Sequence, residues 1–359
     1  MKANKGEWSE FYAFLKILED KKLFAADNKL EIIAGKFFIF KKIIRSETNK
    51  KRKIFELKES EICILDDEGN LLKKIKDEEL KGKTLNIFKK IKNSKGTTFE
   101  IPEAEVLMQK LLCSQLKSDN SKKSDIDGVV YDRVSDKEDL LGFSVKSMIG
   151  GASTLLNAGE TTNFVYEVKN LSPALISKIN NISSRSKIQD RLKAILKNGG
   201  ILEFYKIFKP EFEINLRKID TIFPIFLSQM LLDFFMGNAN KVSDLIDLLD
   251  KNENLKKNFR LSKSDYEYKM KNLLISAALG MVPGKEWDGF TKAHGGYIVV
   301  KNNGDVICYH LYNRDEFISY LYENTKFESA SSTRHKYGKI YREDNKMYLK
   351  LNLQIRFLA

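Results

Sequence analysis

DIDGVVYDRVSDKEDLLGFSVKS, residues 125–147, is the stretch that decides the fold of this chain. Two β-rich segments, 127–132 and 142–147, flank a charged loop that is short enough for them to pair as an antiparallel hairpin. In that hairpin Asp127 begins one strand and Lys146 ends its neighbour. We therefore expect the carboxylate and the ammonium group to lie close together at one end of the two strands.

A carboxylate beside a lysine suits the hydrolysis of a phosphodiester. The carboxylate holds a divalent cation near the scissile phosphate, and the positive charge offsets the anion that develops in the transition state. Asp127 supplies the first group and Lys146 the second. Two residues before the lysine stands Ser144, and Mg²⁺ prefers charged oxygen ligands to a hydroxyl. A second acid is therefore expected from another part of the chain.

The composition favours a polyanionic partner. The chain of 359 residues holds 62 Lys and Arg against 49 Asp and Glu, a net charge of +13, which attracts phosphates. The alternative is that the lysines reflect an AT-rich genome. Residues 1–10 carry charges where a signal peptide needs an apolar run, and the apolar stretch 222–236 is short and includes polar residues, which is typical of a buried helix. Three widely spaced cysteines, with no CxxC, predict reduced thiols in a cytoplasmic protein without a membrane partner.

The hydrophobic pattern predicts a mixed fold of α/β (α+β) class, with a mixed central sheet flanked by helices. Residues 6–22 show helical spacing of apolar residues, and 101–117 also reads as a helix with Pro102 in its first turn. A strand over 31–45 and a hairpin over 61–75, with the run KKRK at 50–53 between them, predict a basic N-terminal hairpin region. We expect three segments: 1–171 with the core hairpin, a helical insert at 172–290, and a β-rich, DNA-contacting region at 291–359, together one compact unit.

The hairpin resembles the signature of the PD-(D/E)XK nucleases, with Asp125, Ile126 and Asp127 in the PD position and Ser-Val-Lys at 144–146. The resemblance implies a restriction-endonuclease-like core. Many nucleases of this fold place a metal- or water-contacting glutamate on the helix before the core sheet, which points to Glu10. A second candidate is Glu160, whose spacing from Lys146 resembles a relocated acid in NgoMIV-like restriction enzymes. We favour Glu10. The alternative is that Glu10 simply lies on the solvent-exposed face of an amphipathic helix.

Four segments together resemble the HpaII family of type II restriction endonucleases. They are KGEWSEFY near the start, DIDGVVYD…GFSVKSMIGGASTLLNAGETTNFVYEV, GGYIVVKNNGDVICYHLYNRDEF and LNLQIRF at the end. The resemblance runs in order over the whole chain. It implies Mg²⁺-dependent cleavage of double-stranded DNA at a short site, with CCGG as the founder's target, and a cognate DNA methyltransferase. Cleavage of both strands of a palindrome is also compatible with a homodimer.

Polar residues that follow the core hairpin are candidates for DNA binding, because Asn, Gln, Arg and Lys read base edges. The alternative is that these Asn and Thr residues form turns and cap neighbouring elements without contacting DNA. A second loop, 331–339, is expected to contact phosphates, and a third candidate follows the strand that ends near residue 312. The candidates are Ser153, Asn157, Thr162, Asn163, Arg314, Arg334 and Lys336.

Two other functions stay open at this level. One is a DNA-binding protein that kept a nuclease fold without catalysis, which Ser144 in the acidic position favours. The other is a structural or interaction protein. His294 and His310 lack partners at metal-ligand spacing, so we expect packed or hydrogen-bonded histidines rather than metal ligands.

Overall fold

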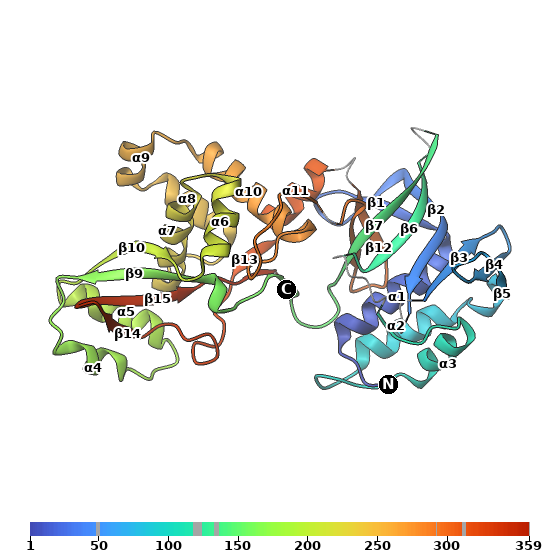
Figure 1. The fold of residues 1–359 in the computed structure, drawn as a ribbon, viewed down its shortest axis with the longest axis horizontal. Coiled ribbons are helices and arrows are strands. Elements are labelled where there is room, and N and C mark those ends of the chain that lie inside the picture. Colours follow the sequence, from blue (N-terminus) through green and yellow to red (C-terminus); the bar gives the residue numbers. More distant parts are fainter. Residues whose placement is uncertain (48–50, 118–123, 133–135, 292, 311–313, 359) are drawn as a thin grey trace. The chain divides into compact units, whose positions relative to one another are not determined.

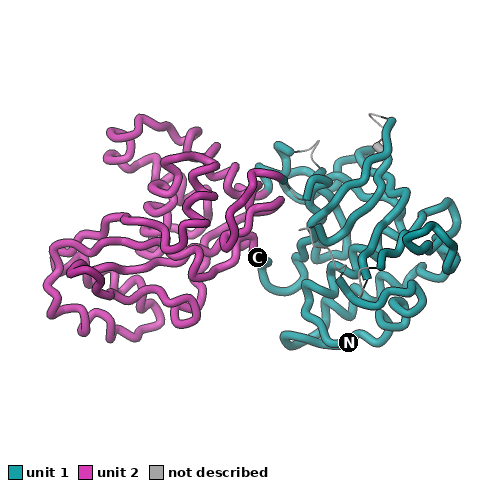
Figure 2. The backbone as a smooth tube through the Cα atoms, in the orientation of Figure 1, with its two compact units in different colours: residues 1–153, 291–320, 359 teal, residues 154–290, 321–358 magenta. Residues whose placement is uncertain are grey.

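The computed structural model describes residues 1–47, 51–117, 124–132, 136–291, 293–310 and 314–358. They form two compact units, each built from separate parts of the chain (Figure 2). Unit 1 comprises 1–153 and 291–320, and unit 2 comprises 154–290 and 321–358. The first boundary lies before the predicted segment end at 171, and the predicted segment 291–359 is divided between both units.

Unit 1 is an α+β structure around a nine-stranded sheet (Figure 1). Its elements are α1 (Lys5–Asp20), β1 (Lys22–Ala26), β2 (Ile32–Ser46), β3 (Arg52–Leu57), β4 (Glu61–Leu65), β5 (Leu71–Lys76), the short 3₁₀ helix η2 (Asp77–Glu79), α2 (Lys83–Asn93), α3 (Pro102–Lys110), β6 (Ile126–Asp132), β7 (Lys137–Ser147), β11 (Gly296–Val300) and β12 (Val306–His310). Helix α11 (Arg314–Glu323) begins in this unit and ends in unit 2.

The strand order in the sheet is β1-β12-β11-β7-β6-β2-β3-β4-β5. An additional pairing of β1 with β2 closes the first six of these strands into a barrel, and β3, β4 and β5 extend from β2 as an antiparallel meander. The meander confirms the predicted basic hairpin region. Strands β7 and β11 are parallel while β6 and β7 are antiparallel, so the central sheet is mixed, as expected.

Helix α1 forms because apolar residues recur at helical spacing and because Asn4 caps its first turn. The Asn4 side chain accepts a hydrogen bond from the Glu7 backbone, and the Glu7 side chain accepts one from the Asn4 backbone, which satisfies two otherwise free N–H groups. The predicted apolar face, which includes Trp8, Phe11 and Phe14, is buried in the core of unit 1. Each such side chain contributes about 1.5–3 kcal/mol to folding.

Helix α11 packs through aromatic rings on strands β11 and β12. Phe317 lies 4.9 Å from Tyr297 and 5.3 Å from Tyr309, and Tyr320 lies 5.0 Å from Tyr309, all between ring centroids. These aromatic residues form a second packed layer, separate from the core that holds α1.

Unit 2 contains most of the helices and two small sheets (Figure 1). Its elements are β8 (Thr154–Leu156), the 3₁₀ helix η3 (Glu160–Thr162), β9 (Asn163–Lys169), α4 (Leu175–Asn180), α5 (Lys187–Lys197), β10 (Ile201–Ile207), α6 (Pro210–Ile219), α7 (Phe223–Met236), α8 (Val242–Asp250), α9 (Glu253–Phe259), α10 (Lys263–Leu279), β13 (Thr325–Phe327), β14 (Ile340–Glu343), β15 (Lys346–Asn352) and β16 (Ile355–Phe357). The sheets have the orders β10-β9-β15-β14 and β13-β16-β8.

Two predicted helical stretches differ from the structure. The helix predicted over 101–117 ends at Lys110, because residues after it bond to strands β2 and β3 instead of continuing the helix. The predicted helical insert contains strand β10, which pairs with β9. Among the described residues, no single helix is long and apolar enough to cross a membrane, although α6 and α7, bent by 109°, meet that length and composition test as a pair.

Candidate active site

The predicted hairpin is confirmed, and its register determines which acid lies near the lysine. Strands β6 and β7 pair with Ile126 opposite Phe143 and Asp127 opposite Gly142. Asp127 is therefore four residues from Lys146 along the neighbouring strand, roughly 13 Å at the rise of a β-strand. A Cβ at Gly142 would lie 2.9 Å from Asp127 Oδ1, so the glycine leaves room for this carboxylate.

Asp125, two residues earlier, is attached directly to the strand that carries Lys146. Its backbone N–H donates to Phe143 O at 2.8 Å. Its Oδ2 accepts hydrogen bonds from Val145 N at 2.7 Å and from Ser144 Oγ at 3.2 Å. Asp125 therefore lies beside the position where the signature usually has its second acid. The geometry favours Asp125 over Asp127 as the acidic partner of Lys146.

Glu10 joins this cluster from helix α1. Its pKa is raised to about 7, chiefly by burial and then by the negative charge of Asp125, whereas Lys117 and Lys146 oppose the shift. Lys117 Nζ forms an ion pair with Glu10 Oε1 at 3.1 Å. Because such electrostatic effects act over short distances, the four side chains belong to one site: two carboxylates and two ammonium groups.

Tyr297 borders the same site from strand β11. It pairs in register with Ser144 and is fully buried. Burial raises the pKa of its hydroxyl well above the ordinary value, and Asp125 is among the charges that add to this shift. The aromatic layer under α11 therefore reaches the site and supplies a low-polarity wall beside Asp125.

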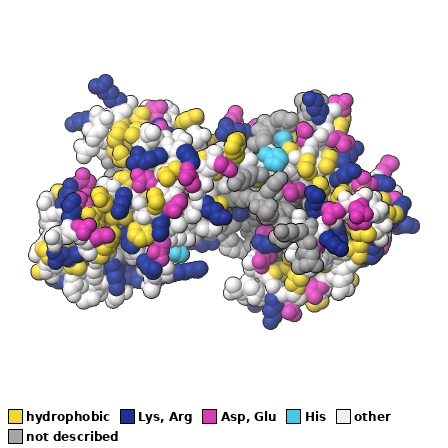
Figure 3. Space-filling model, in the orientation of Figure 1, with side chains coloured by type: hydrophobic (Ala, Val, Ile, Leu, Met, Phe, Trp, Pro, Cys, Tyr) yellow, Lys and Arg dark blue, Asp and Glu magenta, His cyan; other side chains and the backbone are white. Residues whose placement is uncertain are grey.

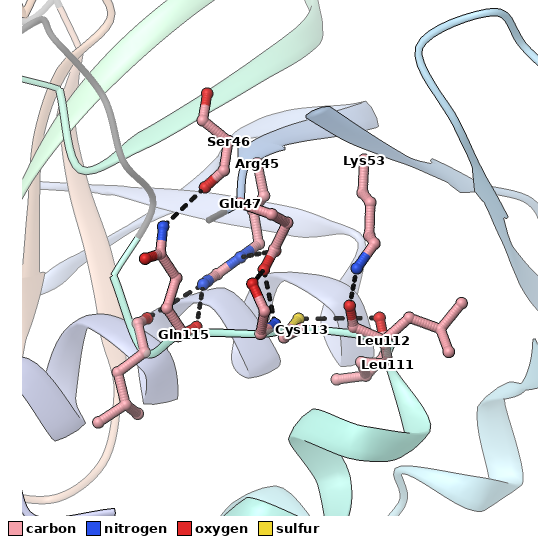
Figure 4. A network of polar contacts seen from close by, with 10 residues as sticks. Arg45, Ser46, Glu47, Lys53, Leu111, Leu112, Cys113 and Gln115 are labelled. Atoms are coloured by element: carbon pink, nitrogen blue, oxygen red, sulfur yellow. Dashed lines mark hydrogen bonds and ion pairs between the residues drawn. The ribbon is translucent and has the colours of Figure 1, made fainter. Parts of the chain in front are cut away.

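Lys117 is positioned by a buried polar network at the end of β2 (Figure 4). The guanidinium of Arg45 donates from Nη2 to Gln115 O at 2.7 Å and to Leu116 O at 3.2 Å. It also lies 4.8 Å from the ring of Phe14 on α1. Arg45 thus contacts both the helix that carries Glu10 and the segment that carries Lys117.

Glu47, the residue directly after β2, completes the network. It lies 3.4 Å from Arg45 Nε and accepts a hydrogen bond from Ser114 N at 2.6 Å. Lys53 donates to Leu112 O from the adjacent strand β3 (Figure 4). The side chains of Arg45 and Glu47 are only 6% and 4% exposed, so this charge pair is shielded from water and fixes segment 111–117 against the sheet.

Glu160, the other predicted acid, lies in unit 2. Its Oε1 forms an ion pair with Lys336 Nζ at 2.7 Å, and this lysine lowers the pKa of Glu160. The structure thus joins Glu160 to a residue predicted to bind DNA. The cluster around Asp125 and Lys146 is built from unit 1 without it.

Two of the predicted base-reading residues are buried. Thr162 and Asn163 have no exposed surface. Asn352 Nδ2 donates to Asn163 Oδ1 at 2.8 Å and lies 3.2 Å from Thr162 Oγ1, and Asn163 Nδ2 donates to His335 O at 2.9 Å. Neither side chain is available to a base in this structure, because both are buried in this network, and Asn163 also holds the loop at 331–338 in place.

The other predicted DNA-binding residues are at least partly accessible. Asn157, Arg314 and Arg334 are exposed, Lys336 is 68% exposed, and Ser153 is half-buried at the end of the first part of unit 1. The structure does not bring them into one cluster, since Arg314 begins α11 in unit 1 whereas Arg334 and Lys336 lie in unit 2.

The histidines behave as expected. His310 is buried and stacks on Phe38, with ring centroids 4.5 Å apart, and His294 Nε2 lies 3.1 Å from Leu140 O. Both are packing or hydrogen-bonding residues.

Comparison with known proteins shows the family of this chain. The family model for the HpaII restriction endonuclease matches residues 4–357. The chain belongs to the HpaII restriction endonuclease family. It is 37% identical over 363 residues to the type II restriction enzyme HpaII of Haemophilus parainfluenzae, a match that covers 99% of this chain and 98% of that relative. No solved structure matches the chain significantly.

Membership in the HpaII family makes restriction endonuclease the enzyme class of this chain, and such enzymes generally use divalent metal ions. The described residues contain no group of three or more His, Cys, Asp and Glu side chains arranged to hold a metal. Mg²⁺, however, is typically held by one or two carboxylates with water and substrate phosphate. Asp125 and Glu10 fit this donor set, and a cation would offset the burial and the charge of Asp125, which together raise the pKa of Glu10.

The structure places Asp125, two residues before the predicted Asp127, beside Ser144, and it adds Lys117 to the cluster, a residue that the sequence pattern did not single out. Asp125 was in the quoted PD position, but sequence spacing does not reveal strand register. No sequence pattern marks Lys117 as a site residue, because it follows an apolar stretch that resembles a continuing helix.

Proposed function

We propose that this chain cleaves double-stranded DNA at a short site, CCGG, by Mg²⁺-dependent hydrolysis of phosphodiester bonds. One observation carries the proposal. Asp125 is hydrogen-bonded to Ser144 and Val145, next to Lys146, and interacts electrostatically with Glu10 from α1. The CCGG target rests on the family resemblance and on the relative from Haemophilus parainfluenzae.

We propose further that β6 and β7 form the centre of a PD-(D/E)XK core. In this core Asp125 takes the first acidic position, Lys146 is the lysine of the signature, and Glu10 replaces the acid that Ser144 lacks. Asp127 is the second candidate for the first acid. We place Glu160 outside the metal site, because it forms an ion pair with Lys336 in the predicted DNA-binding loop.

Asp125 and Glu10 are the residues that would hold Mg²⁺, which when bound polarises the phosphodiester and favours hydroxide formation from water. Lys146 offsets the charge that develops on the phosphate oxygens. Lys117 holds the Glu10 carboxylate in a fixed position and favours its ionised form. The packed wall of Tyr297 and its neighbours limits water on one side of the site.

The wider setting follows from the enzyme class. We propose a cognate DNA methyltransferase as functional counterpart, a cytoplasmic location, and a homodimer as the state that cuts both strands of a palindrome.

The proposal is tested by digesting a sequenced plasmid with the purified protein in Mg²⁺ and in EDTA and then sequencing the ends. Discrete fragments in Mg²⁺ alone, ending within CCGG, are expected. Asp125→Asn is expected to lower the cleavage rate at least about a hundredfold, the scale for loss of an essential electrostatic group. Asp127→Asn is the matched control. If the control abolishes cleavage and Asp125→Asn does not, the assignment of the two acids is wrong.

Ser144 favours a second candidate, a DNA-binding protein without catalysis. That function predicts selective binding with no cleavage at any Mg²⁺ or Mn²⁺ concentration. Cleavage by the unmodified protein eliminates it.

A further inference from the structure

Unit 2 contains a hollow of about 360 Å³ between helix α5 and the loop that precedes β14. Its basic lining residues are Lys187, Arg191, Lys336, Lys339 and Lys350, and no Asp or Glu is found among the described residues that line it. Figure 3 shows Lys and Arg side chains gathered along the lower edge of unit 2. A concave surface with one sign of charge focuses the potential and attracts anions.

Arg191 gives the hollow a buried charge. The residue is 5% exposed, and its guanidinium donates to Gly338 O at 2.6 Å, Asn180 O at 2.8 Å and Ile182 O at 2.6 Å. Its Nε is buried without a hydrogen-bond partner among the described residues. These acceptors are neutral carbonyls, so they satisfy N–H groups without cancelling the positive charge. A buried charge of this kind is stabilised by an anion.

Lys350 adds a second, partly desolvated cation. Burial lowers its pKa, Lys336 lowers it further, and Glu160 acts in the opposite direction. Its Nζ lies 4.3 Å from the ring of Phe208 and 5.3 Å from that of Tyr341. The aromatic rings hold the ammonium group in place but supply no full negative charge. An anion in the hollow would therefore be attracted by Lys350 as well as by Arg191.

The hollow is formed before any ligand arrives. Gly338 has a φ of +80°, which strains other residues, and a Cβ there would lie 2.0 Å from Ile188 Cδ1 of α5, so a glycine favours this turn and its close approach to the helix. Asn163 holds His335 O, and Tyr337 Oη donates to Ala330 O at 2.6 Å. The loop and helix α5 thus fix the basic side chains relative to one another, which lowers the entropic cost of binding.

We propose that this hollow binds a backbone phosphate of the duplex DNA, with Arg191, Lys187, Lys339 and Lys350 as the groups that contact it. The inference rests on the proposed function, which makes DNA the polyanion that this protein meets. Lysine ammonium groups act as point charges on phosphate, and phosphate contacts add affinity without reading sequence. Unit 2 would therefore strengthen DNA binding independently of the acids in unit 1.

The test compares the double variant Lys339→Ala/Lys350→Ala with a control of equal charge, Lys251→Ala/Lys257→Ala, whose lysines are exposed elsewhere in unit 2. Binding of a short labelled duplex is measured by fluorescence anisotropy in EDTA over a series of salt concentrations. Loss of one phosphate contact is expected to reduce the slope of log affinity against log salt by about 0.9. The reduction should be equal for duplexes with and without CCGG, and Lys339→Arg/Lys350→Arg should restore it.

Equal slopes for the hollow variant and the control overturn the proposal. A second pair of results also overturns it. In that case inorganic phosphate stabilises the unmodified protein against heat but not the hollow variant, while both proteins bind the duplex equally well. If Lys350→Ala fails to fold, the exposed Lys339→Gln alone decides the question. Failure of the unmodified protein to cut a plasmid in Mg²⁺ would overturn the proposed function and leave the slope comparison readable.

Discussion

At the scale of single residues, the site is governed by the unfavourable ionisation of Glu10. Burial and Asp125 raise its pKa from the ordinary value of 4.5 to about 7. A carboxyl group whose pKa is higher in the folded state favours folding when protonated. That contribution is fully present below pH 4.5 and is lost as the pH rises through about 7.

Glu10→Gln should therefore stabilise the metal-free protein at alkaline pH. The amide cannot ionise, so the repulsion with Asp125 disappears above pH 7, whereas below pH 4.5 the variant and the unmodified protein should have similar stability. Urea unfolding in EDTA across this pH range measures the difference. A variant that is less stable at alkaline pH would contradict the buried, repelled state of Glu10.

Lys117 should affect the pH dependence of cleavage through Glu10. Lys117 lowers the pKa of Glu10, so Lys117→Met should move the acidic limb of the pH–rate profile to higher pH. Lys110→Met, a lysine of the preceding helix that pairs with Glu79, is the control. An unchanged profile in Lys117→Met would show that the ion pair with Glu10 has no role in activity.

At the scale of elements, the buried pair Arg45–Glu47 connects β2, α1 and segment 111–117. Removing one partner of a buried pair leaves an uncompensated charge and typically costs about 3–5 kcal/mol. Arg45→Met should lower the free energy of unfolding by that amount, measured by urea denaturation. Arg52→Met is the control, because Arg52 pairs with Asp67 on the surface. A loss below about 1 kcal/mol, typical of exposed pairs, would mean that the network does not hold the segment.

The core hairpin shows which features of the fold could be predicted from the sequence and which could not. The residue pattern predicted two paired strands at 127–132 and 142–147, and the structure has β6 over Ile126–Asp132 and a longer β7 that begins at Lys137. A shift of two residues keeps the same face, so alternation could not choose between the two aspartates. The register is set by contacts with β2 and β11, far along the chain.

The burial of Thr162 and Asn163, which were predicted to read bases, could not be foreseen for a related reason. Thr162 and Asn163 resemble base-reading residues because they are polar and follow the core hairpin, but their partner Asn352 comes from strand β15 near the end of the chain. Strand β10 was expected to be helical because it lies between helices, and its pairing with β9 decides otherwise.

At the scale of the whole molecule, the two units suggest separate contributions to one activity. Unit 1 holds the acids and lysines of the candidate active site, and unit 2 holds the basic hollow. We expect Asp125→Asn to bind duplex DNA in EDTA at least as tightly as the unmodified protein, because it removes a negative charge near the phosphates. Anisotropy measurements test this, and weaker binding by the variant would show that Asp125 also supports the DNA-binding surface.

The closure of the sheet limits how copies of this chain can associate. Because β1 pairs with β2, six strands have no open edge between them, and β5 is the remaining outer strand of this sheet within the described part of unit 1. Strand β5 carries Lys73, Lys74 and Lys76, and lysines on an edge discourage strand addition. Strand pairing between copies through this sheet is therefore disfavoured, so unit 1 would meet a second copy through side-chain surfaces, and the same lysines protect this sheet from edge-to-edge aggregation.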